Sequence, residues 1–218
     1  MAQQQRGRRT RSAILDAAAS VFNEFGYEGA TIAQILAKAE LTKGALYFHF
    51  TSKEELARGV LAEAVTTEGV LPQESKLQEW VDVGLALAYR LPREPLLSAS
   101  LKLSLDLNAR RLFGTRWQDW VSLMTDLLVQ AKAAGELLPD VDPQATARLL
   151  VGAWTGVQVL SEDLPDSPTL EEQVALLYAH LLPAIAVSGT LARLDTSPDR
   201  GERIVADFVE ATKAGAAS

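Results

Sequence analysis

The chain has no cysteine and only two histidines, His49 and His180, among its 218 residues. The absence of cysteine excludes disulfide bonds, thiolate nucleophiles and cysteine-bound zinc. The sequence also has no His-x-x-x-His motif, no glycine-rich phosphate loop and no Gly-x-Ser-x-Gly motif. We therefore expect no catalytic residue, no metal site and no cofactor, and we predict that the protein is not an enzyme.

Long apolar runs are missing as well. No stretch of about 18 hydrophobic residues occurs, and the chain does not open with a charged segment followed by an apolar one. We expect neither a membrane-spanning nor a secreted protein, and predict a cytoplasmic one. Hydrophobic residues make up 48% of the chain and the mean hydropathy is +0.04, so a substantial core can be buried.

The net charge of −7 is unevenly distributed. Residues 1–60 hold eight Lys/Arg and six Asp/Glu, whereas the remaining 158 residues hold 13 and 22. Such asymmetry indicates that the amino-terminal end faces nucleic acid. Residues 1–9 are polar and basic, and we expect them to be disordered in the free protein. The four arginines near the start are predicted to reach phosphates or the minor groove, although a solubilising tail is the alternative: Arg6, Arg8, Arg9 and Arg11.

The most informative segment is Thr31–Phe50, TIAQILAKAELTKGALYFHF. Thr31 and Gln34 have the spacing of a capping box at the start of a first helix, and Thr42 is a candidate N-cap for a second. Apolar residues recur at helical spacing on both sides of the break Ala39-Glu40-Leu41: Ile32, Ile35 and Leu36 before it, and Ala45, Leu46 and Phe50 after it. Two helices joined by so short a break predict a helix-turn-helix, which places its second helix in the DNA major groove.

The second helix of this segment has an unusual composition. Gly44 in its first turn costs roughly 1 kcal/mol relative to alanine, but it lets the backbone approach another surface closely. Around it stand hydroxyl and cationic or cation-capable groups that suit phosphates and base edges: Thr42, Lys43, Tyr47 and His49. Thr31, at the start of the first helix, is also expected to hold a phosphate. The alternative interpretation is a surface helical hairpin without a ligand.

A further helix is predicted from Lys53 to about residue 65, with a second capping box formed by Ser52 and Glu55. Lys53 is unfavourable at a helix N-terminus, which prefers anions. A DNA phosphate held between Lys53 and the free amides would resolve this conflict, although a solvated lysine is an equally simple interpretation.

The remaining chain is predicted to be helical, which gives an all-α fold with seven to ten helices. Residues 11–25 form an amphipathic helix with Phe22 and Phe25 in the core. Residues 96–107 fit both a strand and a helix, and we favour the helix because a lone strand has no partner. The other expected helices cover 77–91, 117–134, 143–160, 170–187 and 201–212. We place a helix-turn-helix DNA-binding domain at 1–65 and a larger ligand-binding and dimerisation domain at 66–218.

The helix-turn-helix residues resemble those of a known family. KGALYFHF followed by Ser52-Lys53-Glu54-Glu55-Leu56 is similar to the recognition helix and next helix of TetR-type repressors, and Ile14–Ile35 resembles their first two helices. The resemblance is closer to the gamma-butyrolactone receptor branch, through Arg116-Trp117 and the Lys132–Pro139 segment. It is specific over residues 8–65 and weaker over 77–187. The usual turn glycine of the family is Glu40 here, which costs about 1 kcal/mol if the position needs a positive φ.

A ligand pocket is predicted in the second domain. The small residues Gly84, Gly152 and Gly156 leave room between helices, and all four tryptophans lie there: Trp80, Trp117, Trp120 and Trp154. Core packing is the simpler interpretation of Trp80 and Trp120. The resemblance implies that Trp117 stacks on the ligand and that Thr155 hydrogen-bonds its lactone part, whereas Ala64 stands where the family has a glutamine. The predicted ligand set also contains Leu85, Tyr89, Val151 and Gln158.

Together these features predict a ligand-responsive repressor that associates with the nucleoid. Its expected partners are double-stranded operator DNA, a small apolar effector of the gamma-butyrolactone or butenolide class, and a second copy of the chain joined through residues 143–187. An antibiotic or drug-like effector is one alternative. A helical interaction protein without a DNA partner is another, from a different class.

Overall fold

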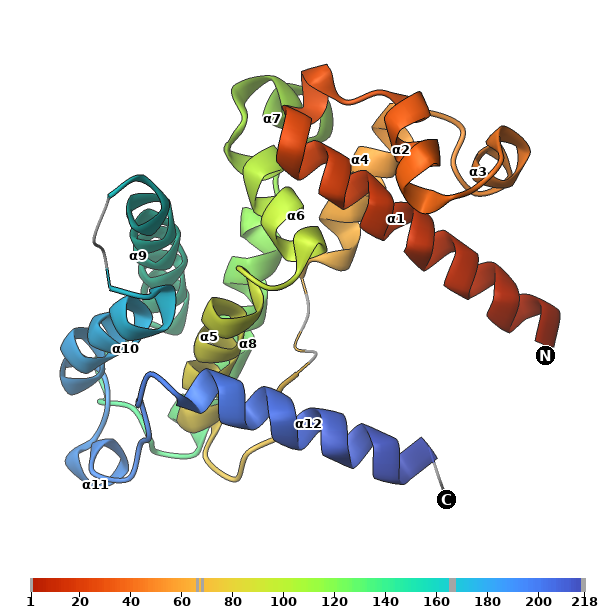
Figure 1. Cartoon of the computed structure of the whole chain (residues 1–218). Helices are drawn as coiled ribbons and strands as arrows, with labels where there is room; N and C mark the ends of the chain where they lie inside the picture. Colours follow the sequence, from red (N-terminus) through yellow and green to blue (C-terminus); the bar gives the residue numbers. More distant parts are fainter. Residues whose placement is uncertain (1, 66, 68, 165–167, 217–218) are drawn as a thin grey trace. The chain divides into compact units, whose positions relative to one another are not determined.

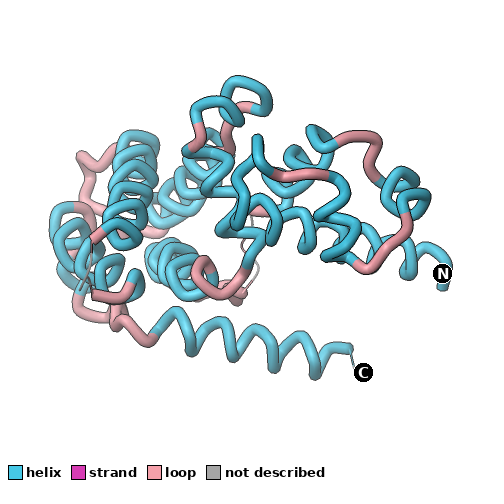
Figure 2. The backbone as a smooth tube through the Cα atoms, turned by 45° about the horizontal axis from the view of Figure 1, so that its top comes forward, coloured by secondary structure: helices cyan, strands magenta, loops and turns pink. Residues whose placement is uncertain are grey.

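The computed structural model describes residues 2–65, 67, 69–164 and 168–216. Helices joined by short loops make up these ranges, which confirms the all-α class (Figures 1 and 2). The described residues form twelve α-helices and one 3₁₀ turn: α1 (Ala2–Gly29), α2 (Ile32–Ala39), α3 (Lys43–His49), α4 (Lys53–Glu63), α5 (Lys76–Arg90), α6 (Pro95–Leu105), α7 (Leu107–Phe113), α8 (Trp117–Ala133), α9 (Pro143–Asp163), α10 (Leu170–Leu181), η1 (Leu182–Ala184), α11 (Ser188–Leu191) and α12 (Arg200–Ala216). The predicted number was too low because the short α7 and α11 carry little periodicity. No helix in the described ranges is long and apolar enough to cross a membrane.

The chain divides into two compact units. The first contains residues 1–66 and 91–116, and the second contains residues 67–90 and 117–218. The chain first passes between the units near the boundary predicted at residue 66, although Thr66 itself lies outside the described residues. Residues 91–116 belong to the first unit by their contacts, so this unit extends beyond the predicted domain 1–65.

The first unit is built around α1, which packs against α2, α4 and α6 (Figure 1). Its core joins apolar side chains from these four helices and from α3, including Ile14, Ile35, Leu46, Leu56 and Leu103. Residues 96–107 are helical rather than a strand, as favoured above, but they do not form one helix: α6 ends at Leu105, and Asp106 caps α7 by accepting from the Ala109 N–H. Helices α6 and α7 pack against α4, and α6 also packs against α1. The helix-turn-helix is therefore held on a packed support.

Helix α1 differs from its predicted form at both ends. It begins at Ala2 rather than near Arg11, so residues 2–9 are helical, whereas disorder was expected for residues 1–9; residue 1 lies outside the described residues. Gly26 has φ 68° and ψ 175° and interrupts the helix. Phe22 is buried as predicted, but Phe25 is 44% exposed, because it lies beside this interruption rather than on the buried face.

The second unit is organised around α5, which contacts α8, α10 and α12, while α9 packs against α8 and α10. Trp80 on α5 is fully buried, as the core interpretation predicted, and its ring meets Tyr178 edge-on at 5.4 Å between centroids. Gly84 permits this packing, because a Cβ at that position would overlap the Tyr178 hydroxyl. Trp120 is only half-buried, so it is not a core residue.

An ion pair joins α12 to α5, and further ion pairs join α12 to the segment that precedes it. The Arg200 guanidinium donates to both carboxylate oxygens of the fully buried Asp82, at 2.5 and 2.7 Å, and to Asp195 at 3.1 Å. Arg203 also donates to Asp195 at 2.9 Å. A buried carboxylate is costly unless it is paired, so Asp82 strongly favours the docked position of α12.

Candidate DNA-binding surface and effector pocket

The two helices of the helix-turn-helix are capped by the local interactions that the sequence predicts. Thr31 and Gln34 form the capping box of α2, since the Thr31 hydroxyl accepts from the Gln34 N–H and the Gln34 side chain accepts from the Thr31 N–H. Thr42 caps α3 by accepting from the Ala45 N–H at 3.3 Å. Both caps use the side-chain oxygens of Thr31 and Thr42, two of the residues proposed to hold phosphates.

The turn between α2 and α3 contains a left-handed residue. Glu40 has φ 54° and ψ 36°, and no other non-glycine residue in the described ranges has a positive φ. Its N–H donates to carbonyls of the last turn of α2, as a C-terminal cap does. The turn therefore keeps its geometry without the usual glycine, at the expense of backbone strain.

One side of α3 is open to solvent. Lys43, Gly44 and Tyr47 are exposed, and the Lys43 ammonium lies 5.8 Å from the centre of the Tyr47 ring. A Cβ added to Gly44 would meet no protein atom within 4 Å, so packing of the fold does not require glycine there. His49 is half-buried and its ring meets that of Phe48 edge-on.

Phe48 was not among the residues that the sequence predicted to contact DNA. Its side chain is 83% exposed on α3, which is unusual for a phenylalanine. An aromatic ring on a recognition helix can contact thymine methyl groups in the major groove. Phe48 follows Tyr47 on α3 and does not belong to the apolar set that includes Leu46 and Phe50. Its absence from that set was the indication in the sequence that Phe48 faces outward.

Lys53 is bound by backbone carbonyls rather than left at a free helix end. Its ammonium donates to the carbonyl oxygens of Tyr27 at 2.8 Å and Ala30 at 3.0 Å, and lies 4.4 Å from the centre of the Tyr27 ring. These contacts resolve the conflict at the start of α4 without a phosphate. Burial, followed by the neighbouring Glu54 carboxylate, raises the pKa of the Tyr27 hydroxyl to about 12.

The second capping box differs from its prediction in one bond. Ser52 accepts from the Glu55 N–H at 3.2 Å, as expected. The Glu55 carboxylate, however, accepts from the N–H and hydroxyl of Thr51, at 2.6 and 2.7 Å. The hydroxyl of Thr51 offers a second donor to the carboxylate, which explains why Glu55 reaches one residue further back.

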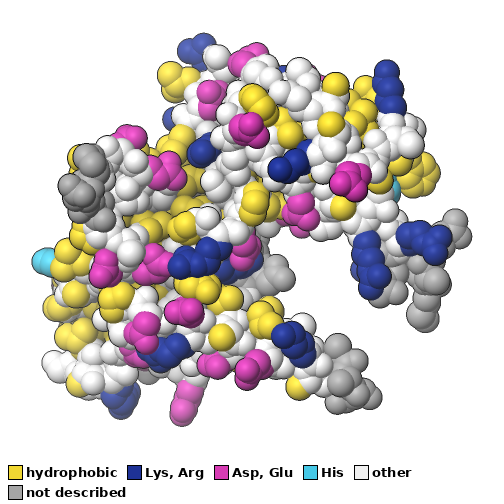
Figure 3. Space-filling view, in the orientation of Figure 1, with side chains coloured by type: hydrophobic (Ala, Val, Ile, Leu, Met, Phe, Trp, Pro, Cys, Tyr) yellow, Lys and Arg dark blue, Asp and Glu magenta, His cyan; other side chains and the backbone are white. Residues whose placement is uncertain are grey.

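The basic segment occupies the first turns of α1. Arg6, Arg8 and Arg9 are exposed, and Lys/Arg side chains gather near the amino-terminal end of the helix (Figure 3). Arg11 instead pairs with Glu63 at 2.7 Å and lies 5.3 Å from the centre of the Phe50 ring. Arg11 therefore has protein partners that a phosphate would have to displace, whereas Arg9 has none among the described residues.

The predicted effector residues fall on three helices of the second unit. Val151 and Thr155 are joined on α9, where the Thr155 hydroxyl donates to the Val151 carbonyl at 2.8 Å. On α5, the backbone of Leu85 and the Cβ of Tyr89 approach Gly201 of α12. Trp117 is the half-buried first residue of α8, and within the described part of the chain no hydrogen bond or ring contact joins it to the others.

Two buried polar atoms in this unit lack partners among the described residues. They are the Oε1 atom of Gln158 and the Nε1 atom of Trp80. Gln158 is 2% exposed, and its Nε2 donates to Glu162 at 2.5 Å. The neighbouring Trp154 does find a partner, because its Nε1 donates to the Gly84 carbonyl at 3.2 Å. Unpaired buried polar atoms cost free energy and indicate sites that a ligand or water completes.

The described residues include no group of three or more His, Asp or Glu side chains placed to hold a metal ion. What they do include is a capped helix-turn-helix with an open second helix, carried on a helical core, together with a separate helical unit. This combination defines a helix-turn-helix transcription regulator.

Comparisons with known proteins specify the family. Residues 14–60 match the model of "Bacterial regulatory proteins, tetR family". The chain is 39% identical over 195 residues to the A-factor receptor protein of Streptomyces griseus, covering 89% of this chain and 70% of that protein. The protein belongs to the TetR family of DNA-binding transcriptional regulators, which are not enzymes.

Solved structures agree with this assignment. TylP, a TetR regulator from Streptomyces fradiae, has 42% sequence identity and a TM-score of 0.84, with coverage of 93% of this chain and 99% of TylP. A gamma-butyrolactone receptor described as ArpA-like has 26% identity and a TM-score of 0.71, with coverage of 93% and 99%. The predicted relation to gamma-butyrolactone receptors is thereby confirmed.

Proposed function

We propose that the protein is a repressor that binds a pseudo-palindromic operator as a homodimer and is released by a small apolar effector of the gamma-butyrolactone or butenolide class. It would act in the cytoplasm on nucleoid DNA. The open side of α3 carries this proposal, because Lys43, Gly44, Tyr47 and Phe48 form an exposed surface that the fold itself does not use. Family membership does not support a helical interaction protein without a DNA partner.

In this proposal Lys43, Gly44, Tyr47 and Phe48 contact bases or the adjacent backbone. The phosphate contacts come from the edges of the same surface: Arg9, Arg11, Thr31, Thr42, His49 and Lys53. Phosphate contacts position the protein and base contacts give specificity. The Lys53 ammonium already donates hydrogen bonds to three backbone carbonyls. We therefore expect Lys53 to contribute less to DNA binding than the other residues of this set.

The unpaired Oε1 atom of Gln158 supports an effector site in the helical unit. A hydroxyl or amide on an otherwise apolar effector would donate to this atom and remove the cost of burying it without a partner. Trp117, half-buried at the start of α8, supplies an aromatic face for stacking. The relation to the A-factor receptor and to a gamma-butyrolactone receptor favours a lactone over an antibiotic or drug-like effector.

An apolar surface on α9 and α10 supports the homodimer. Leu149 and Leu176 are 62% and 58% exposed, and Gly152 and Gly156 lie exposed between Leu149 and Leu160 at helical spacing on α9. A Cβ at either glycine would meet no atom within 4 Å, so close packing within the chain does not require them. Hydrophobic side chains are visible at the surface over α10 (Figure 3). We assign this surface, called the α9–α10 surface below, to a second copy.

The effector assignment is tested by operator release. Trp117→Ala and Gln158→Leu should bind operator DNA normally in a gel shift but lose release by a synthetic butanolide, because each removes one proposed effector contact. Trp120→Ala, on the same helix and also half-buried, is the matched control and should respond normally. Normal release of both site variants would contradict this pocket, and release by an antibiotic but not by a butanolide would favour the alternative effector.

A further inference from the structure

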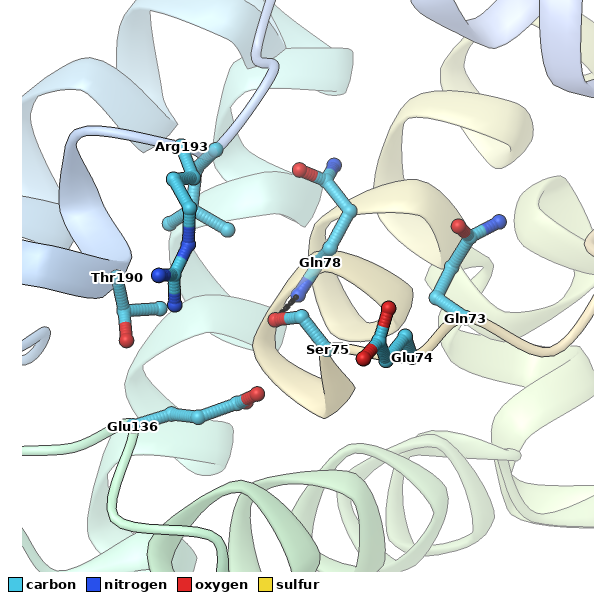
Figure 4. A pocket seen from close by; sticks show the side chains of 8 residues that line it. Gln73, Glu74, Ser75, Gln78, Glu136, Thr190 and Arg193 are labelled. Atoms are coloured by element: carbon cyan, nitrogen blue, oxygen red, sulfur yellow. Dashed lines mark hydrogen bonds between the residues drawn. The ribbon is translucent and has the colours of Figure 1, made fainter.

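A cavity lies in the second unit, and its lining residues are not those predicted to bind the effector. Its volume is about 540 Å³, within the range of small-molecule sites. The cavity is bounded by the residues preceding α5, by the start of α5, by the loop after α8, and by α11 with the segment after it. None of the six predicted effector residues lines it. Figure 4 shows that its side chains are mostly polar.

Arg193 brings an unpaired positive charge to this cavity. Its guanidinium makes no ion pair or hydrogen bond with any described residue. The carboxylate nearest in sequence is Asp195, but Arg200 and Arg203 already occupy it, at 3.1 and 2.9 Å. These hydrogen bonds, together with those from Ser197, hold the pKa of Asp195 well below its usual value against the opposing effect of partial burial. Arg193 is therefore available to an anionic group from outside the chain.

Thr190 is the second observation that indicates a ligand. Its side chain is only 5% exposed and lines the cavity, yet its hydroxyl forms no hydrogen bond with another described residue. Figure 4 shows Thr190 and Arg193 together on one wall. Thr190 is a buried residue whose hydroxyl is open to the cavity, and this hydroxyl and the Arg193 guanidinium are a suitable donor pair for a carboxylate.

Acidic and hydroxyl groups line the other walls. The Glu136 carboxylate is fixed by one oxygen, Oε2, which accepts from the Leu77 N–H at 2.7 Å, and its other oxygen is free to accept. Ser75 accepts from the Gln78 N–H at 3.2 Å and keeps its own hydroxyl proton to donate. The exposed carboxylate of Glu74 lies beside Ser75 (Figure 4). The cavity thus has a positive wall and a negative wall.

We propose that this cavity binds a small zwitterion, of amino-acid or dipeptide size, whose carboxylate contacts Arg193 and Thr190 and whose ammonium contacts Glu136. The opposed charges of the walls select this class, because an anion alone would leave Glu136 and Glu74 unpaired and a cation alone would leave Arg193 unpaired. The site is independent of the proposed lactone pocket. The bound molecule would bridge α5, the end of α8 and the segment leading to α12.

The test uses calorimetric titration of the full-length protein with matched probes. Glycylglycine and L-glutamine carry both charges, N-acetylglycine carries only the carboxylate, and glycinamide carries only the ammonium. We expect binding of at least one zwitterion and weaker binding of both single-charge probes. Arg193→Gln and Glu136→Gln should each weaken zwitterion binding by about tenfold or more, since each removes a charge-assisted contact. Glutamine at position 136 can still accept from the Leu77 N–H, so the fold is preserved.

Arg111→Gln, an exposed arginine of α7 in the other unit, is the control and should leave binding unchanged. Failure of both zwitterions to bind would overturn the proposal, and so would equal affinities for wild type and Arg193→Gln. Trp117→Ala should bind the zwitterion normally. A loss of binding in Trp117→Ala would overturn the independence of the two sites.

Discussion

Glu40 shows how one residue can preserve a turn at a cost in stability. A left-handed conformation costs an L-residue about 1–2 kcal/mol, whereas glycine adopts it freely but adds about 0.4–1 kcal/mol of entropy to the unfolded chain. Glu40→Gly should therefore raise the free energy of unfolding by up to about 1 kcal/mol, measured by urea denaturation. Glu40→Ala keeps the strain and should gain nothing. Equal stability of the two variants would show that the conformation is not strained.

At Gly44, a substitution should raise the stability of the protein and lower its affinity for DNA. Because a Cβ there meets no protein atom, Gly44→Ala should stabilise α3 by about 0.5–1 kcal/mol. The same methyl group would stand where the backbone approaches DNA, so operator affinity should fall by about tenfold or more in a fluorescence anisotropy titration.

Gly215→Ala in α12 is the matched exchange, since a Cβ there also meets no atom. It should gain stability with no change in operator affinity. If Gly44→Ala binds operator as tightly as the wild-type protein, the backbone at Gly44 does not face DNA.

At the scale of elements, structural features that depend on residues close together in the chain could be predicted from the sequence. The caps at Thr31 and Thr42 involve residues three apart, so their spacing is visible in the chain. Lys53 was ambiguous because its partners lie 23 and 26 residues away, at Ala30 and Tyr27. The assignment of residues 91–116 to the first unit likewise depends on packing between distant segments, which helical periodicity does not encode.

The same distinction applies to the candidate functional residues: those on one short helix could be predicted from the sequence, and those brought together by tertiary packing could not. Lys43, Gly44 and Tyr47 were found from composition and resemblance on one short helix, and the structure places all three at its surface. The effector residues come from α5, α8 and α9, and their mutual placement is set by tertiary packing. The unpaired Gln158 Oε1 and the cavity at Arg193 depend on which side chains lack a partner, which only the folded structure reveals.

The stability of the protein should depend on pH through Asp195, whose carboxylate accepts from Ser197 and from Arg200 and Arg203 of α12. Its folded-state pKa is lowered, so its contribution to stability is present above the ordinary aspartate pKa near 4 and is lost as the pH falls through the folded value. Acid titration of the wild type should therefore show progressive loss of stability below about pH 4. Asp195→Asn should be less stable near neutral pH, and its difference from the wild type should shrink as the pH falls. A difference independent of pH would exclude the ionised Asp195 as its cause.

At the scale of the whole molecule, operator binding depends on joining two copies of α3. If the α9–α10 surface is the dimer interface, Leu149→Glu combined with Leu176→Glu places charges on the proposed contact and should yield monomers in sedimentation velocity. Operator affinity should then fall by about a hundredfold or more, because the two half-sites lose their linkage. The helical content should remain, since neither leucine contributes to the buried core.

Leu112→Glu is the control for this pair, because Leu112 is an exposed leucine of α7 outside the α9–α10 surface. It should remain dimeric and bind operator normally. A double variant that stays dimeric with normal operator affinity would place the interface elsewhere on the chain. A double variant that is monomeric yet binds operator with unchanged affinity would show instead that one copy of α3 suffices, which would contradict the proposed two-site recognition.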